Sequence, residues 1–194
     1  MKAKLIGATL LAASLAACGG KASFTIGGTI SGLGNQGLVL QNDGGDDIHV
    51  SAGATSFSFP NSISYGTNYN VTIKTQPDHM TCVVANPIGS AGHTTSISIV
   101  ITCAQNSYTL SGTVIGYSGD GLVLVNGSSS GTIAVAKGAT AFALPGAIAV
   151  GDAYGLSVLT QPSNPTQTCT FDAGSNTGVM GDANRTNVVL RCSP

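Results

Sequence analysis

Charged side chains are scarce in this sequence, making up 8% of its 194 residues. Tryptophan and glutamate are absent, and eight aspartates face seven Lys and Arg residues, for a formal net charge of −1. Nucleic-acid binding requires a dense basic surface, so this composition excludes a nucleic acid as partner. Long helices and coiled coils draw heavily on Glu, Lys, Leu and Ala, so the lack of glutamate argues against them.

Apolar residues and glycine are abundant instead. The apolar fraction is 42% and there are 27 glycines. Hydrophilic disorder requires low hydrophobicity or a high net charge, so the chain is expected to fold. The composition favours a globular β-rich protein whose surface is polar through Ser, Thr, Asn and Gly.

The N-terminus has the pattern of an export signal. Two lysines within Met1–Lys4 precede an apolar run of 13 residues, Leu5–Ala17. A helix that spans a bilayer needs about 20 apolar residues, so this run is too short. Its length and basic flank are those of a secretory signal peptide, predicted to be residues 1–17.

The end of this run, Leu15-Ala16-Ala17-Cys18, resembles a bacterial lipobox. The resemblance implies cleavage before Cys18 and a diacylglycerol on that cysteine, which makes the membrane a partner through the N-terminal lipid. Gly19 in the next position implies sorting to the outer membrane of a Gram-negative cell. The alternative is an ordinary signal peptide with an accidental cysteine near its end. In the lipoprotein interpretation, residues 18–23 form a lipidated tether of at most roughly 20 Å.

The remaining chain contains one pattern twice. Residues 28–32, 37–42 and 75–77 recur as residues 112–116, 121–126 and 160–162. The offset grows from 84 to 89 residues, and only across loop-like segments rich in Gly, Ser, Asn and Pro. The repetition predicts two domains, residues 24–103 and 107–194, joined by a linker at 104–106. With so short a linker, we expect them to stack end to end with little independent motion.

Short alternating or apolar runs fill both copies, with turn residues between them. In the first copy they include residues 24–26, 38–40, 56–59, 69–73 and 96–101. About seven such strands per copy are typical of an all-β sandwich. Aromatic residues recur in register and are expected to be core residues or to pack like a tyrosine corner: Phe24 and Tyr108, Phe57 and Phe142, Tyr69 and Tyr154.

Four of the five cysteines sit at corresponding positions of the two copies. Cys82 and Cys103 are 21 residues apart, and Cys169 and Cys192 are 23 apart. Small exported domains commonly carry disulfides, so we predict one bridge within each copy, each stabilising by about 3 kcal/mol. Four free buried thiols are the alternative. A metal site is not expected, since it would need four ligands around a cysteine pair.

Motifs that resemble catalytic sites lack the required context. Residues 32–37 match G-x-G-x-x-G but precede a predicted strand rather than a helix. Residues 127–131 match G-x-S-x-G, yet no histidine follows them. Three aspartates within residues 43–47 are expected to form a solvated turn rather than a Ca²⁺ site, and His49, His79 and His93 occupy unlike places. We therefore predict no catalytic residue, no cofactor and no metal, although a catalytic pair among the eight aspartates stays open.

Two tyrosines lie near turns and do not recur between the copies. Tyr65 and Tyr117 are thus the aromatic candidates for a ligand-binding surface, such as a platform for a sugar ring. The alternative is that they cover the edges of loops.

The lipobox and the tandem pattern G-T-[IV]-x-G, G-L-V-L-x-N, T-Q-P, Cys, Cys together resemble a family of proteobacterial exported lipoproteins with immunoglobulin-like repeats. The motif order is also similar to prealbumin-like regulatory domains, which occur beside carboxypeptidases and in surface adhesins. The resemblance implies two β-sandwiches and a non-enzymatic envelope lipoprotein, acting as a spacer or adhesin-like module. Its partner would be an unidentified envelope protein or glycan. The alternative function is a carbohydrate- or small-ligand-binding module that uses inter-strand loops.

Overall fold

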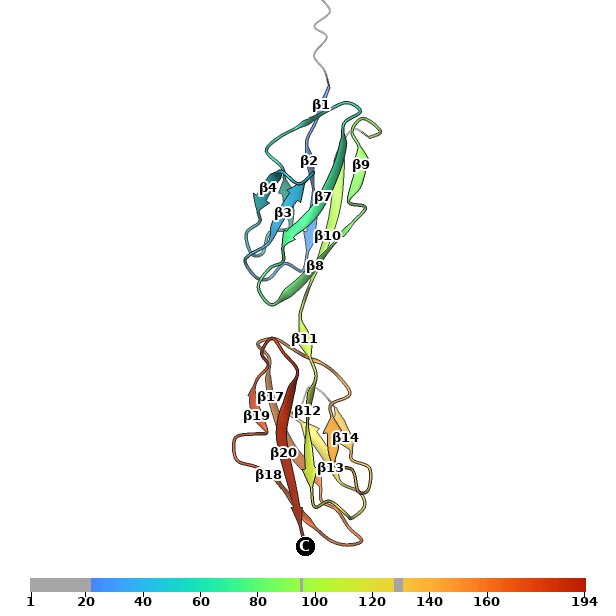
Figure 1. The fold of residues 1–194 in the computed structure, drawn as a ribbon, viewed down its shortest axis with the longest axis vertical. Helices are drawn as coiled ribbons and strands as arrows, with labels where there is room; N and C mark the ends of the chain where they lie inside the picture. Colours follow the sequence, from blue (N-terminus) through green and yellow to red (C-terminus); the bar gives the residue numbers. More distant parts are fainter. Residues whose placement is uncertain (1–21, 95, 128–130) are drawn as a thin grey trace, which may run out of the picture.

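The computed structural model describes residues 22–94, 96–127 and 131–194 (Figure 1). Throughout these residues the regular structure is β-strand, twenty strands in all. No helix among them is a candidate for crossing a membrane. Cys18, the signal peptide and most of the tether lie outside the described residues.

The first repeat contains ten strands in three sheets. Two four-stranded sheets have the orders β5-β2-β10-β8 and β4-β3-β7-β9, and a two-stranded sheet pairs β1 with β6. The strands are β1 (Ser23–Phe24), β2 (Ile26–Ser31), β3 (Val39–Asn42), β4 (Asp46–His49), β5 (Ser56–Ser58), β6 (Ile63–Ser64), β7 (Asn68–Thr75), β8 (Met80–Ala85), β9 (Ile88–Ser90) and β10 (Ile97–Gln105).

The second repeat has the same topology. Its sheets are ordered β15-β12-β20-β18, β14-β13-β17-β19 and β11-β16, which matches the first repeat strand for strand. The strands are β11 (Ser107–Tyr108), β12 (Leu110–Ile115), β13 (Val123–Asn126), β14 (Thr132–Ala134), β15 (Ala141–Ala143), β16 (Ile148–Ala149), β17 (Ala153–Thr160), β18 (Thr168–Phe171), β19 (Thr177–Val179) and β20 (Arg185–Ser193).

Each repeat is a β-sandwich with a core of its own. Alternate residues of the long last strand are buried, as in Ile97–Cys103 of β10, and they pack against the second sheet. The two cores draw on separate sets of residues, 26–103 and 110–190. The predicted all-β fold of two sandwich domains is therefore confirmed. Ten strands per repeat exceed the predicted seven partly because two in each are two-residue strands, too short for a sequence pattern.

The recurring G-T-[IV]-x-G motif serves the parallel pairing of the first and last long strands. A side chain at Gly28 would collide with the backbone of Ile99 on β10, which approaches closely there. Gly32 closes the motif with a φ of 77°, and its counterpart Gly116 has 79°. Glycine adopts this left-handed conformation without the steric cost that a side chain adds. The first glycine of the motif thus allows the close approach of the two parallel strands, and the last glycine allows the turn that follows β2.

The recurring tyrosines cover glycines on the neighbouring edge strand. Tyr69 lies directly opposite Gly89, and Tyr154 lies directly opposite Gly178. In each pair a side chain on the glycine would strike the tyrosine ring, which therefore rests on the bare backbone. Among the described residues the Tyr154 hydroxyl has no hydrogen-bond partner. Tyr154 is a core residue as predicted, but it lacks the hydrogen bond that defines a tyrosine corner.

Candidate functional site

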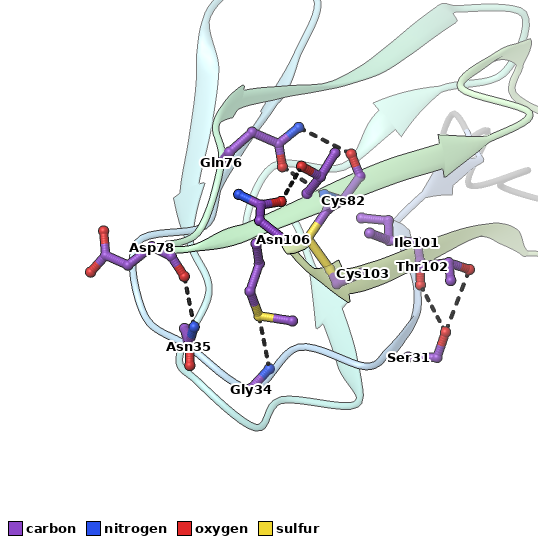
Figure 2. Close-up of a disulfide and its surroundings, with 12 residues drawn as sticks. Ser31, Gly34, Asn35, Gln76, Asp78, Cys82, Ile101, Thr102, Cys103 and Asn106 are labelled. Carbon is purple, nitrogen blue, oxygen red and sulfur yellow. Dashed lines mark hydrogen bonds between the residues drawn. A yellow bond between two sulfur atoms is a disulfide. The ribbon is translucent and has the colours of Figure 1, made fainter. Parts of the chain in front are cut away.

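Both predicted cysteine pairs form disulfides. Cys82 on β8 stands opposite Cys103 on β10 (Figure 2). Cys169 on β18 stands opposite Cys192 on β20. Three of the four cysteines are buried, and Cys192 is partly buried. Each bridge ties an edge strand to the neighbouring inner strand of its sheet.

The glutamine of the T-Q-P motif protects the edge strand beside each disulfide. The Cys82 backbone N–H donates to Gln76 Oε1 at 2.7 Å, and Gln76 Nε2 donates to the Cys82 carbonyl at 3.0 Å (Figure 2). Gln161 makes the same pair of bonds with Cys169, at 2.8 and 3.1 Å. The glutamine side-chain amide thus occupies the backbone N–H and carbonyl of the edge-strand cysteine, which a further strand could otherwise pair with.

A second recurring position holds the loop between the first two long strands. In repeat one, Met80 Sδ accepts the N–H of Gly34 at 3.4 Å. The register of the disulfide strands places Gln167 at the corresponding position of repeat two. Gln167 Oε1 accepts the N–H groups of Ser118 and Gly119, at 2.8 and 2.9 Å, and its Nε2 donates to the Gly116 carbonyl at 2.7 Å. Residues 32–37 thus belong to a loop between β2 and β3, as predicted.

The junction between the repeats is short and hydrogen bonded. β10 continues to Gln105 and β11 begins at Ser107, so the predicted linker 104–106 is mostly strand, with Asn106 alone between the two. The Asn106 N–H donates to the His79 carbonyl at 2.9 Å, and the Asn106 carbonyl accepts the N–H of Val150 at 2.9 Å. Gln105 Nε2 donates to the Val150 carbonyl at 3.2 Å. Asn106 therefore contacts both repeats, which follow one another along the long axis (Figure 1).

A side-chain pair adds to this junction. His79 Nδ1 lies 2.8 Å from Asp182 Oδ1, 103 positions along the chain. The hydrogen bond and the charge of Asp182 raise the pKa of His79 above its ordinary value. His79 lies in the turn between β7 and β8 and has a φ of 58°. No sequence pattern indicated that His79 would have a partner.

The two tyrosine candidates differ in exposure. Tyr65 is 71% exposed and lies 6.5 Å from the Phe24 ring, so it remains an aromatic candidate for a ligand surface. Tyr117 is 7% exposed, and its hydroxyl donates to the Val135 carbonyl and accepts the N–H of Leu122. The prediction that Tyr117 could serve as a ligand platform is therefore wrong: the residue fills the core.

The aspartates of residues 43–47 do not converge on one point. Asp47 pairs with Lys74 and accepts a hydrogen bond from Gln41, and these contacts lower its pKa, the Lys74 bond most. Asp46 accepts a hydrogen bond from Asn61 at 3.0 Å. Within the described ranges no three His, Cys, Asp or Glu side chains are grouped as metal ligands would be. The serines of the G-x-S-x-G match, residues 128–130, lie outside the described residues.

No protein-family model matches the chain. The curated proteins contain no significant match either.

Proposed function

We propose that the protein is a non-enzymatic envelope lipoprotein whose two sandwiches form a stiff spacer or adhesin-like module. The observation that supports this most is the junction, where Asn106 bonds to both repeats and His79 contacts Asp182. Hydrogen bonds on both sides of a one-residue connection oppose bending. A stiff unit of this kind can hold a binding surface at a set distance from its anchor.

The stiffness can be measured in solution. Small-angle scattering of residues 19–194 should give one narrow distribution of extended shapes. Inserting Gly-Gly-Ser after Asn106 should broaden that distribution, because flexible Gly and Ser residues remove the direct connection. A distribution that is equally broad with and without the insertion would show that the junction does not restrain the repeats, and would overturn the spacer proposal.

The anchor is proposed from the lipobox. In this proposal Cys18 carries the lipid, and the protein resides in the outer membrane of a Gram-negative bacterium. Two or three acyl chains hold a protein on a bilayer far more firmly than one. Radiolabelled palmitate should enter the wild-type protein and be lost in Cys18→Ser, with Cys82→Ser as the matched control that keeps the label. Label retained in Cys18→Ser would refute the anchor.

Spacer and adhesin-like roles differ in binding. An adhesin-like protein, purified without its lipid, should bind intact cells or isolated envelope, whereas a spacer should not.

A carbohydrate-binding module is the second candidate, because Tyr65 is an exposed aromatic ring supported by Phe24. Binding to a glycan array that is lost in Tyr65→Ala would favour that candidate, and unchanged binding would remove Tyr65 from it.

A further inference from the structure

Three asparagines of this chain stand in the sequence Asn-x-Ser/Thr, in which x is not proline: Asn70, Asn126 and Asn184. In exported proteins this sequence is the acceptor motif for N-linked oligosaccharides. The oligosaccharide is bulky and hydrophilic and is carried by the amide nitrogen, so the asparagine must lie on the surface with that nitrogen free. The three positions differ in how well they meet this requirement.

Two of the three asparagines lie in surroundings that oppose modification. Asn126 is 2% exposed, and its Oδ1 accepts the N–H of Gly155 at 2.8 Å. Asn70 is exposed, but it lies within β7, which is paired with β3 on one side and β9 on the other. Its backbone N–H donates to Asn42 Oδ1 and its carbonyl accepts the N–H of Asp43. A transferase could bind this segment in its active site only after the strand had left the sheet.

Asn184 lies in the loop between β19 and β20, directly before β20 begins. The residue is exposed, and its Oδ1 accepts the backbone N–H of Thr109 at 2.9 Å. Among the described residues its Nδ2 has no hydrogen-bond partner. The nitrogen that would carry a glycan is therefore free, while the oxygen of the same amide is held.

The threonine of this motif is also accessible. β20 pairs with β12 at Arg185 and again at Val188, and the register shifts between these two positions. A residue at such a bulge is left out of the ladder of backbone hydrogen bonds. Thr186 lies at this shift and is exposed, and residues 182–186 all line one open hollow of the surface. A transferase can therefore bind the acceptor segment with little disruption of the sheet.

An acidic residue, Asp182, precedes Asn184 by two positions, and neither of the other two motifs has an acid at this place. Its carboxylate gives a transferase a charged group to bind in addition to the threonine hydroxyl, and bacterial oligosaccharyltransferases select an acid there. Asp182 lies 2.8 Å from His79 Nδ1, but both side chains are about half exposed. Because exposed ion pairs contribute little to stability, a transferase can compete for this carboxylate.

We propose that Asn184 is the site of an N-linked glycan, transferred to the exported protein from a polyprenyl diphosphate-linked oligosaccharide. Asn184 Nδ2 forms a bond to the anomeric carbon of the first sugar and loses a proton to a basic group of the transferase. The bond from that carbon to the diphosphate oxygen breaks, and the polyprenyl diphosphate leaves with the electron pair. The proposal rests on export, as the proposed function does, but it requires neither the lipid at Cys18 nor a spacer or adhesin-like role.

The test is glycan transfer in vitro, which depends on neither the export signal nor the lipid. Folded protein of residues 19–194 is incubated with a purified bacterial oligosaccharyltransferase and its polyprenyl diphosphate-linked oligosaccharide, and the products are analysed by intact mass and peptide mapping. The transferase's own acceptor peptide shows that the enzyme is active. The wild-type protein should gain one oligosaccharide, on Asn184. No transfer to the protein, or transfer to Asn70 instead, would overturn the proposal.

Matched variants test the asparagine and the threonine. Asn184→Gln should abolish transfer, because the longer side chain displaces the amide nitrogen, whereas Asn70→Gln should leave it unchanged. Thr186→Val keeps the shape of the side chain without its hydroxyl and should slow transfer about 10-fold or more, while Thr186→Ser should retain it. Transfer retained in Asn184→Gln, or lost equally in Thr186→Val and Thr186→Ser, would overturn the assignment.

Asp182 needs a control of its own, because it also contacts His79. Asp182→Asn should slow transfer about 10-fold, the effect of losing a hydrogen bond to a charged group. His79→Ala breaks the same contact but keeps the acid, and it should change the rate of transfer less than about 2-fold. An equal loss in both variants would refute the role of Asp182 in recognition.

Discussion

Gln167 offers a direct test of how the loops of repeat two are held. Its side chain is 6% exposed and makes three hydrogen bonds to the backbone of the loop after β12. Repeat one has Met80 at this position, with one contact from Gly34 to sulfur. Gln167→Met therefore installs the side chain that the other copy already tolerates, with nearly the same volume and without the amide.

The expected cost follows from the bonds that are lost. A hydrogen bond within a protein contributes about 0.5–1.5 kcal/mol net, and backbone groups left buried without partners cost more. A methionine sulfur can replace one of the three contacts weakly. We expect Gln167→Met to lower the free energy of unfolding of repeat two by about 2–3 kcal/mol.

Hydrogen exchange followed by NMR measures the loss of unfolding free energy in each repeat separately. Amides of β12 and β20 that exchange only on unfolding should exchange about 30- to 150-fold faster in Gln167→Met, since each 1.4 kcal/mol is a factor of ten. Those of β2 and β10 should be unchanged, because repeat one has its own core. Gln36→Met, an exposed glutamine in repeat one, is the control and should alter neither repeat. Unchanged protection in repeat two would refute the reasoning on Gln167, and equal loss in both repeats would refute the independence of the two cores.

Three further predictions concern the disulfides, the junction and the core of repeat two. Peptide mapping without reductant should give only the pairs Cys82–Cys103 and Cys169–Cys192, and replacing either pair with alanine should cost about 3 kcal/mol in urea unfolding; a pair linking the two repeats would contradict the model of two domains. The pKa of His79 is raised by Asp182, so this contact stabilises the junction fully below pH 6.5, the ordinary histidine value, and the stabilisation is lost as the pH rises through the raised pKa. An NMR titration of His79 should show that pKa falling in Asp182→Asn, and an unchanged value would disprove the contact. Tyr154→Phe removes a buried hydroxyl that lacks a partner in the described structure and should raise the stability of repeat two by about 1 kcal/mol, measured by calorimetry; a loss of stability would show that the hydroxyl is bonded.

The duplication made the fold predictable. Each insertion between the copies fell in a loop, so recurring residues could be assigned to strands, and recurring cysteines to bridges, without an alignment to other proteins. The recurring tyrosines were expected to be core residues, but their contact with a glycine of the neighbouring strand was not predicted. A sequence shows that Gly89 and Tyr69 exist, whereas their contact depends on the register of β7 against β9.

Other features depend on distant contacts that no local pattern encodes. Tyr117 resembles a loop residue because glycine and serine surround it, yet it takes the buried place that Leu33 holds in repeat one. His79 and Asp182 lie 103 positions apart, in loops of different repeats.

The turn that carries His79 also bears on how many sandwiches can follow one another. Its counterpart in repeat two carries Asn164, with a φ of 53°, and the counterpart of Asp182 in repeat one is His93. A second molecule added head to tail would bring Asn164 against His93, where no opposite charges meet. Repeating an identical contact is how folded subunits grow into open filaments. Because each copy carries only one half of the His79–Asp182 contact, a further copy added head to tail could not repeat this contact.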